Sequence, residues 1–124
     1  MWPIERTDEI AGWIETLDDD AKEAILKVLF ILSEMGPSLG RPYVDSVNKS
    51  RYQNMKELRI QSKQRLFRIF FSFDPERNVI LLFGGDKRGD KRFYQSMIPI
   101  ADRLYERHLK KVKEHHENSG KKDK

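Results

Sequence analysis

The 124-residue sequence predicts an α+β fold, in which two N-terminal helices pack on a small antiparallel β-sheet and a C-terminal helix follows. Two segments before residue 36 place apolar residues at helical spacing. Between residues 55 and 83, three runs rich in aromatic and β-branched residues follow one another. Only short polar turns separate these runs, so consecutive strands are expected to pair as an antiparallel meander.

The chain is predicted to begin with a short strand and a short helix. Residues 2–5 are compatible with a strand, and Pro3 would put that strand at a sheet edge or at its first position. Thr7 is a good N-cap for an amphipathic helix over residues 8–17. Acidic residues in the first turn of this helix suit the helix dipole.

A longer helix is predicted over residues 21–35, with the aspartates at positions 18–20 as its N-cap. Gly36-Pro37 ends it in the usual order, with Gly past the last turn and then Pro. Phe30 and Ile31 widen the apolar stripe of the helix. The sequence therefore predicts a well-buried helix that pairs with the first one and packs on the sheet.

The strands follow a long segment, residues 37–54, which is rich in Pro, Gly, Ser and Asn and is expected to form a loop. Side chains alternate between the two faces of a strand, which places Arg59 and Arg68 on the sheet face opposite the helices. The two arginines would be neighbours there if the register allows. The three strands are predicted at residues 56–60, 65–73 and 78–83.

The last predicted element is a helix that begins near Phe93. Its apolar side ends at about Leu109, after which the sequence is polar and basic. We therefore assign residues 1–110 to a single domain and residues 111–124 to a basic, disordered tail.

Charge is distributed unevenly along the chain. The net charge is +4, but residues 1–50 hold 5 Lys/Arg against 10 Asp/Glu, while the remainder holds 19 against 10. A sequence pI near 9.3, with the excess of cations after position 50, favours a nucleic-acid or acidic-protein partner. The alternative is that these cations only form a solvated, soluble surface.

Composition also limits the compartment and the chemistry. With no cysteine, the chain has no disulfide, no thiolate chemistry and no Cys-based zinc site. The three histidines lie in or near the tail, so we expect no metal and no cofactor. The sequence shows neither an apolar run of the roughly 20 residues needed to cross a bilayer nor a signal-peptide pattern. A cytoplasmic protein without a membrane partner is expected.

The candidate functional residues are cations within and after the strands. Arg59 and Arg68 sit in the middle of strands, where a cation is costly unless it faces water or a ligand. A guanidinium fork is well suited to holding a phosphate and to stabilising transition-state charge. The structural alternative is that each arginine pairs with a local carboxylate, such as Glu57 or Asp74. A further basic cluster directly follows the last strand: Lys87, Arg88, Lys91 and Arg92.

Three other residues near these positions are weaker candidates. Tyr94 belongs either to the core or to the arginine face, where its phenol would stack on a base or take part in proton transfer. Lys56 and Glu57 offer a cation and a potential general base, but adjacent strand positions point to opposite faces.

Four segments together are similar to a known family: MKELRI, RLFRIFFSFD, NVILLFGGDKRGDKRFY and IPIADRLYERHL. In this order and at these separations they resemble the RelE/ParE toxin superfamily, most closely its HigB-like (phage Gp49-like) branch. The resemblance implies a RelE-like fold and the toxin of a type II toxin–antitoxin pair. It also implies a metal-independent endoribonuclease that cleaves mRNA, usually on the ribosome, and a cognate antitoxin, which we expect to be of the helix-turn-helix type.

By position, the resemblance gives catalytic roles to Arg59, Arg68 and Tyr94, and to either Lys87 or Arg88 as the cation after the last strand, of which we take Lys87. We assign RNA binding to Lys56, Arg65, Arg88, Lys91 and Arg92. Glu57 departs from the family pattern, because other members often carry a second cation there.

Two alternative functions remain open from the sequence. One is a ParE-like toxin that poisons DNA gyrase through protein–protein contacts. The other is a non-catalytic basic module that binds RNA or the ribosome.

Overall fold

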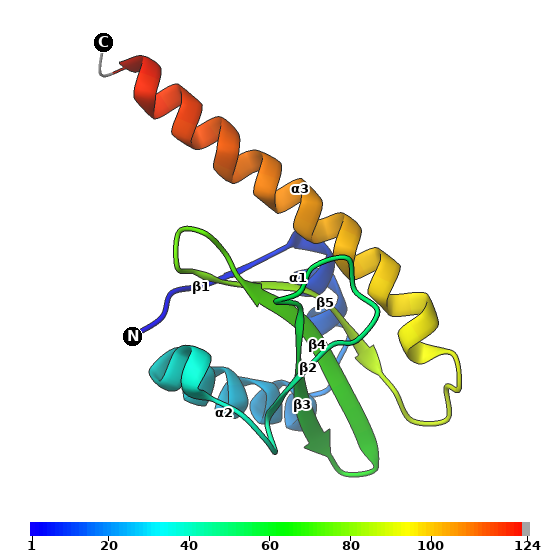
Figure 1. Ribbon diagram of the computed structural model, residues 1–124. Helices are drawn as coiled ribbons and strands as arrows, with labels where there is room; N and C mark the ends of the chain where they lie inside the picture. Colours follow the sequence, from blue (N-terminus) through cyan, green and yellow to red (C-terminus); the bar gives the residue numbers. More distant parts are fainter. Residues whose placement is uncertain (123–124) are drawn as a thin grey trace.

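The computed structural model describes the backbone of residues 1–122 and the side chains of residues 1–117. It confirms the α+β fold with two N-terminal helices, a sheet and a C-terminal helix (Figure 1). Within residues 1–122, no helix combines the length and apolar character that a membrane-spanning segment requires. The elements run in the order β1 (Ile4–Arg6), α1 (Asp8–Glu15), α2 (Asp19–Met35), the 3-10 turn η1 (Gly36–Ser38), β2 (Val44–Ser46), β3 (Lys56–Ser62), β4 (Arg65–Phe73), β5 (Val79–Asp86) and α3 (Phe93–Lys122).

The sheet has five strands in the order β1-β5-β4-β3-β2. The predicted meander of β3, β4 and β5 is antiparallel, as expected. The sheet as a whole is mixed, because β1 pairs parallel to β5. The predicted loop 37–54 also contains β2, which pairs antiparallel with β3. The short first strand predicted at residues 2–5 overlaps β1, whereas β2, with three residues inside a loop-like segment, carries too little alternation for a reliable signal.

The N-terminal helices begin where the sequence predicts. The Thr7 hydroxyl accepts the backbone N–H of Ile10 at 3.1 Å, and the Asp18 carboxylate accepts that of Ala21 at 2.9 Å. Each bond satisfies a backbone donor that the first turn leaves free. At the other end of α2, Gly36 has φ +56°, a conformation that favours glycine.

A core on each face of the sheet makes the molecule three layers deep. On one face, α1 packs against β5 and α2 against β3, with Ile10, Ile25 and Leu32 fully buried. On the other face, α3 packs against β4 and β5, where Phe70 and Leu82 are fully buried. In Figure 1, α2 and α3 accordingly lie on opposite sides of the strands.

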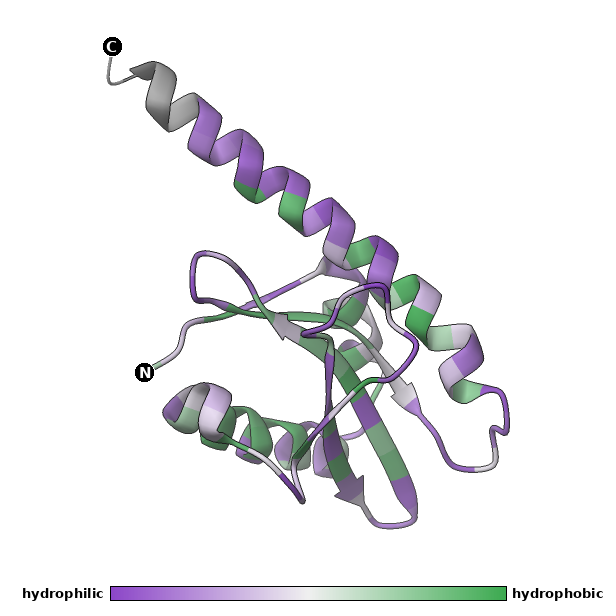
Figure 2. Cartoon of the chain, in the orientation of Figure 1, coloured by the Kyte–Doolittle hydropathy of each residue, from purple (hydrophilic) through white to green (hydrophobic). Residues whose placement is uncertain are grey.

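Helix α3 continues to Lys122, past residue 111, where we predicted a disordered tail to begin. Val112 is still buried, so the contact of the helix with the rest of the molecule extends beyond Leu109. Between Val112 and the part drawn in grey, the helix is hydrophilic (Figure 2). Lys and Glu are good helix formers, which is why a polar composition does not end the helix. Residues 123 and 124 lie outside the described part of the chain.

Two polar contacts fasten the middle of α3. Arg107 donates from both terminal nitrogens to the Glu9 carboxylate of α1, each at 2.7 Å. This hydrogen-bonded pair lowers the pKa of Glu9 to about 2. One residue further on, His108 contacts Asp74 at the end of β4 at 2.8 Å.

The outer face of α2 corrects one prediction. Phe30, which we expected to be buried, is 63% exposed, and Leu26 is 65% exposed. The stripe of Ala21, Ile25, Val28 and Leu32 already covers the sheet. Phe30 therefore faces solvent, whereas Ile31 is partly buried and packs against the core, as predicted.

A buried and an exposed phenylalanine allow a matched test of the core. Phe70→Ala should lower the free energy of unfolding by about 3–5 kcal/mol, because it leaves a cavity beneath α3. Phe30→Ala, on the exposed face of α2, should change it by less than about 0.5 kcal/mol. Urea denaturation of both variants measures the difference. Similar destabilisation of the two would contradict the burial described here.

Candidate functional site

Arg59 and Arg68 are directly opposite each other in the β3–β4 ladder, as the alternation argument anticipated. They lie on the face that α3 covers, beyond the N-terminal end of that helix. Like charges directly opposite each other destabilise a sheet unless something compensates them. The pair therefore needs a counter-charge.

Glu57 supplies that counter-charge. Its side chain is only 4% exposed, and its Oε2 accepts a hydrogen bond from Arg59 Nε at 2.9 Å. Arg68 Nε lies 3.4 Å from the same oxygen. The Tyr94 hydroxyl donates a third contact to this oxygen, at 3.0 Å. One buried carboxylate oxygen is therefore in contact with two guanidinium groups and a phenol hydroxyl.

The two arginines differ in how fully they are satisfied. Arg59 reaches a second carboxylate, since its Nη2 lies 3.3 Å from Asp45 Oδ2. Arg68 donates from Nη1 to the backbone carbonyl of Phe67 at 3.0 Å. Its Nε is buried without a hydrogen-bond partner among the described residues, because the approach to Glu57 lacks hydrogen-bond geometry. A buried donor without a hydrogen bond is costly, and water, an ion or a bound ligand would satisfy it.

Tyr94, on the first turn of α3, completes the cluster. Burial, followed by the hydrogen bond to Glu57, raises the pKa of its phenol above the ordinary value. At neutral pH the phenol is therefore a proton donor. Lys87 Nζ lies 5.8 Å from the centre of the Tyr94 ring, within range of a cation–π contact. The structure thus brings together four predicted catalytic residues: Arg59, Arg68, Lys87 and Tyr94.

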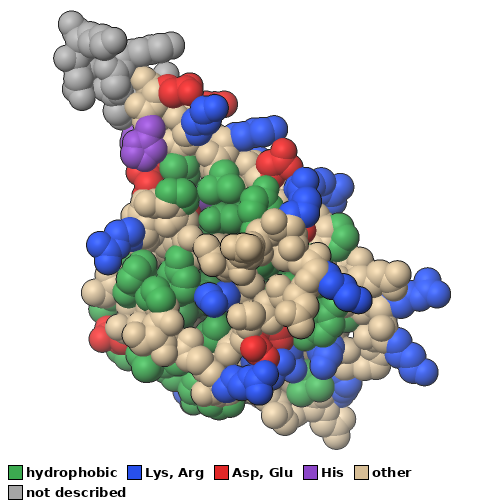
Figure 3. Space-filling view, viewed as in Figure 1, with side chains coloured by type: hydrophobic (Ala, Val, Ile, Leu, Met, Phe, Trp, Pro, Cys, Tyr) green, Lys and Arg blue, Asp and Glu red, His purple; other side chains and the backbone are tan. Residues whose placement is uncertain are grey.

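A groove of about 1140 Å³ runs beside Tyr94. The loop after β5 and the first turns of α3 form one wall, and the loop between β2 and β3 contributes Lys49 and Arg51. Five cations line this groove, which we call the basic groove: Lys49, Arg51, Lys87, Lys91 and Arg103. In Figure 3, Lys and Arg side chains project at the right, over the loop between β5 and α3.

Sequence reasoning missed Lys49, Arg51 and Arg103 as parts of this groove. They belong to a loop and to the middle of a helix, and only the tertiary fold brings them to Tyr94. No local pattern in the sequence signals their position.

A second groove, of about 720 Å³, lies on the other side of the arginines. Arg59 and Arg68 form part of its lining, together with Tyr43 and one edge of α2. The arginine pair is therefore accessible from this groove, and Tyr94 from the basic groove, with the Glu57 carboxylate between them.

Two residues assigned to RNA binding lie elsewhere. By strand alternation, Lys56 shares its face with Leu58, which is buried beneath the N-terminal helices. Arg65 is on the same side, where its Nη2 donates to the Asp18 carboxylate at 3.0 Å. The structure does not bring either residue to the arginine pair.

The cations after β5 separate into two positions. Lys91 lines the basic groove and Arg92 is exposed in the same loop. Arg88 turns toward the β3–β4 hairpin, where its Nη1 donates to the Gln64 backbone carbonyl at 3.2 Å.

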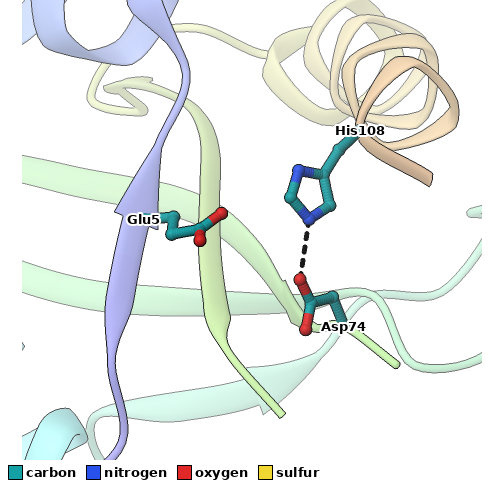
Figure 4. Close-up of side chains that lie close together, drawn as sticks. All are labelled: Glu5, Asp74 and His108. Atoms are coloured by element: carbon teal, nitrogen blue, oxygen red, sulfur yellow. Dashed lines mark hydrogen bonds and ion pairs between the residues drawn. The ribbon is translucent and has the colours of Figure 1, made fainter. Parts of the chain in front are cut away.

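A separate cluster of possible metal ligands includes His108, one of the three histidines that we placed in or near the tail. Glu5, Asp74 and His108 each place one ligand atom within 4.8 Å of the others (Figure 4). Asp74 also accepts the backbone N–H groups of Glu76 and Asn78, at 3.0 and 2.9 Å. The cluster links α3 to the β4–β5 turn. Asp74 is six residues along β4 from Arg68, on the order of 20 Å away.

Together these features describe a small α+β protein with a buried cationic site beside a basic groove. Residues 12–106 match the model of a family described as "Phage derived protein Gp49-like (DUF891)". The chain belongs to this family, which confirms the resemblance to HigB-like toxins.

Two proteins of Mycobacterium tuberculosis (strain ATCC 25618 / H37Rv) are similar to the chain. "Putative toxin HigB3" is 46% identical over 102 residues, which cover 82% of this chain and 88% of that protein. "Putative toxin HigB2" is 41% identical over 104 residues, covering 82% of this chain and 52% of that protein. The chain spans about half the length of the second relative. These similarities identify a toxin of a toxin–antitoxin system, whose partner is a cognate antitoxin.

The Glu57–Tyr94 contact can be tested by titration. In Glu57→Gln the Tyr94 phenol should titrate at a lower pH than in the parent protein, because the negative charge that raises its pKa is gone. Burial should still hold the pKa above its ordinary value. NMR of the tyrosine ring carbons, over the pH range where circular dichroism shows an intact fold, follows all four tyrosines. A shift shared by all of them, or none at Tyr94, would contradict the contact.

Proposed function

We propose that this protein is a metal-independent endoribonuclease toxin that cleaves mRNA on the ribosome and so inhibits translation in the cytoplasm. The observation that carries the proposal is the buried Nε of Arg68, which has no hydrogen-bond partner among the described residues. A phosphate oxygen would satisfy this donor, and a guanidinium is well suited to a phosphate.

In the proposed reaction, the ribose 2′-hydroxyl gives its proton to a water molecule, and its oxygen attacks the adjacent phosphorus atom. The bond from phosphorus to the 5′-oxygen of the next nucleotide breaks, leaving a 2′,3′-cyclic phosphate and a 5′-hydroxyl. Arg68 stabilises the negative charge that builds on the phosphate oxygens. Arg59 holds Glu57 in place through their 2.9 Å hydrogen bond.

Tyr94 is proposed to protonate the leaving 5′-oxygen. Its raised pKa keeps the phenol protonated at neutral pH, which suits an acid and not a base. Lys87, beside the Tyr94 ring, adds positive charge near the leaving group. The flanking RNA backbone would follow the basic groove past Lys49 and Lys91.

The antitoxin is proposed to be a small helix-turn-helix protein, as is expected of the HigB-like branch. Neutralisation of growth arrest by the protein encoded beside the toxin gene would test this assignment.

The first test is RNA cleavage by an Arg68 variant. After brief induction in growing bacteria, primer extension on a reporter mRNA should reveal new cuts inside translated regions. Arg68→Ala should abolish these cuts, and Arg68→Lys should reduce them strongly, because lysine keeps the charge but lacks the planar fork. Lys113→Ala, at an exposed position on α3, is the control that should cut normally.

Two outcomes would overturn this assignment. Cleavage by a well-folded Arg68→Ala variant would remove Arg68 from the site. Growth arrest with intact mRNA and damaged DNA would instead favour a gyrase-poisoning toxin.

The cations of the basic groove lead to a separate prediction about the affinity for single-stranded RNA. The double variant Lys49→Gln/Lys91→Gln should bind single-stranded RNA more weakly, because two cations leave the groove. The slope of log K against log salt should fall by roughly 0.7 for each RNA phosphate that the protein no longer neutralises. Fluorescence anisotropy at several salt concentrations measures it, with Lys113→Gln as the control. An unchanged slope would place the RNA elsewhere.

A further inference from the structure

The outward face of α2 carries large apolar side chains that the fold does not use. Leu26 and Phe30 are 65% and 63% exposed, the two most exposed large hydrophobic residues after Met1 within the described part of the chain. They are four positions apart in a helix, so their side chains are neighbours on one face. Adjacent apolar side chains left in solvent are typical of an interaction surface.

Acidic residues surround this apolar pair. Asp19, Glu23 and Glu34 are exposed on the same side of α2 by helical spacing. Two lysines lie beside them, each near a carboxylate: Lys27 Nζ is 3.8 Å from Glu23, and Lys22 Nζ is 3.9 Å from Glu15. The surface is therefore apolar at its centre and negative at its rim.

These charges argue against RNA as the ligand of this face. A polyanion would be repelled by the rim and would gain nothing from Leu26 and Phe30. The arginine pair and the basic groove lie on the other face of the sheet, where α3 packs. The apolar pair of α2 and the groove beside Tyr94 thus lie in different layers, whereas Glu23, at the edge of α2, also lines the groove of the arginine pair.

We propose that this α2 surface, made of Leu26 and Phe30 with Glu23 and Glu34 at its rim, is a docking site for the antitoxin. The matching segment of the antitoxin is an amphipathic helix or strand that presents apolar side chains flanked by Lys or Arg. The charge complementarity selects a basic partner, and the apolar pair supplies its anchor. The inference rests on the toxin–antitoxin assignment and does not depend on RNA cleavage.

The test measures the affinity for the protein encoded by the reading frame next to the toxin gene. In Leu26→Asp/Phe30→Asp, calorimetric titration should show an affinity reduced by at least about thirtyfold, as expected when interface anchors are removed. Growth rescue by that protein should fail in parallel. Both side chains are exposed, so circular dichroism and the melting temperature should match those of the parent chain.

Two further variants distinguish the contribution of the apolar pair to binding from that of the acidic rim. Glu23→Lys/Glu34→Lys should weaken binding less than the apolar double variant and should weaken its dependence on salt. Lys113→Asp, which adds an acid on the exposed side of α3, should bind as the parent does.

The proposal is overturned if Leu26→Asp/Phe30→Asp binds the neighbouring protein as tightly as the parent chain. It is also overturned if sedimentation shows that the pair holds two copies of this chain together. Cleavage of mRNA by the same variant is measured separately, without the partner. This measurement distinguishes failure of the docking proposal from failure of the endoribonuclease proposal. If the parent chain does not cut RNA, the endoribonuclease proposal fails while the affinity measurement still decides this one.

Discussion

The candidate site depends on one buried carboxylate. The β3–β4 register sets Arg59 against Arg68, and Glu57 makes this arrangement possible by placing a negative charge between them. The same oxygen receives the Tyr94 hydroxyl, which fixes the first turn of α3 against the strands. Strand pairing, helix docking and the pKa of the phenol are therefore linked through one atom.

This arrangement changes the meaning of Glu57. From the family pattern it was a departure, an acid where a cation is often found. In the fold it is the group that allows two guanidiniums to share a largely buried face. Breaking a buried cluster of this kind is costly because it leaves charges unpaired. The structural alternative of local ion pairing therefore holds for both arginines, although the Arg68 Nε, 3.4 Å from Glu57, has no hydrogen bond among the described residues.

Long periodic segments were predictable from the sequence, and so was the central part of the site. The α2 stripe, the three central strands and the Arg59–Arg68 face follow from spacing and alternation alone. The cap residues Thr7 and Asp18 were equally predictable, because capping is a local interaction.

The remaining features depend on contacts between distant segments. The parallel pairing of β1 with β5 joins the two through three residues, too few for a pattern. Phe30 is apolar, but it lies two positions from both Val28 and Leu32, on the side of α2 that faces away from the sheet. His108 is in a polar stretch of sequence, and its contact with Asp74 spans 34 positions. The same dependence on distant segments explains why the sequence did not reveal the groove cations Lys49, Arg51 and Arg103.

The separation of charge between layers has a consequence for how the molecule moves before it binds anything. An acidic helical layer on one side and a basic strand-and-helix layer on the other give the protein a permanent electric moment. In the field of a polyanion, such a molecule rotates as it approaches, so that its cationic side leads. Orientation during diffusion would then precede recognition, and ionic strength would govern how often the first collision is productive.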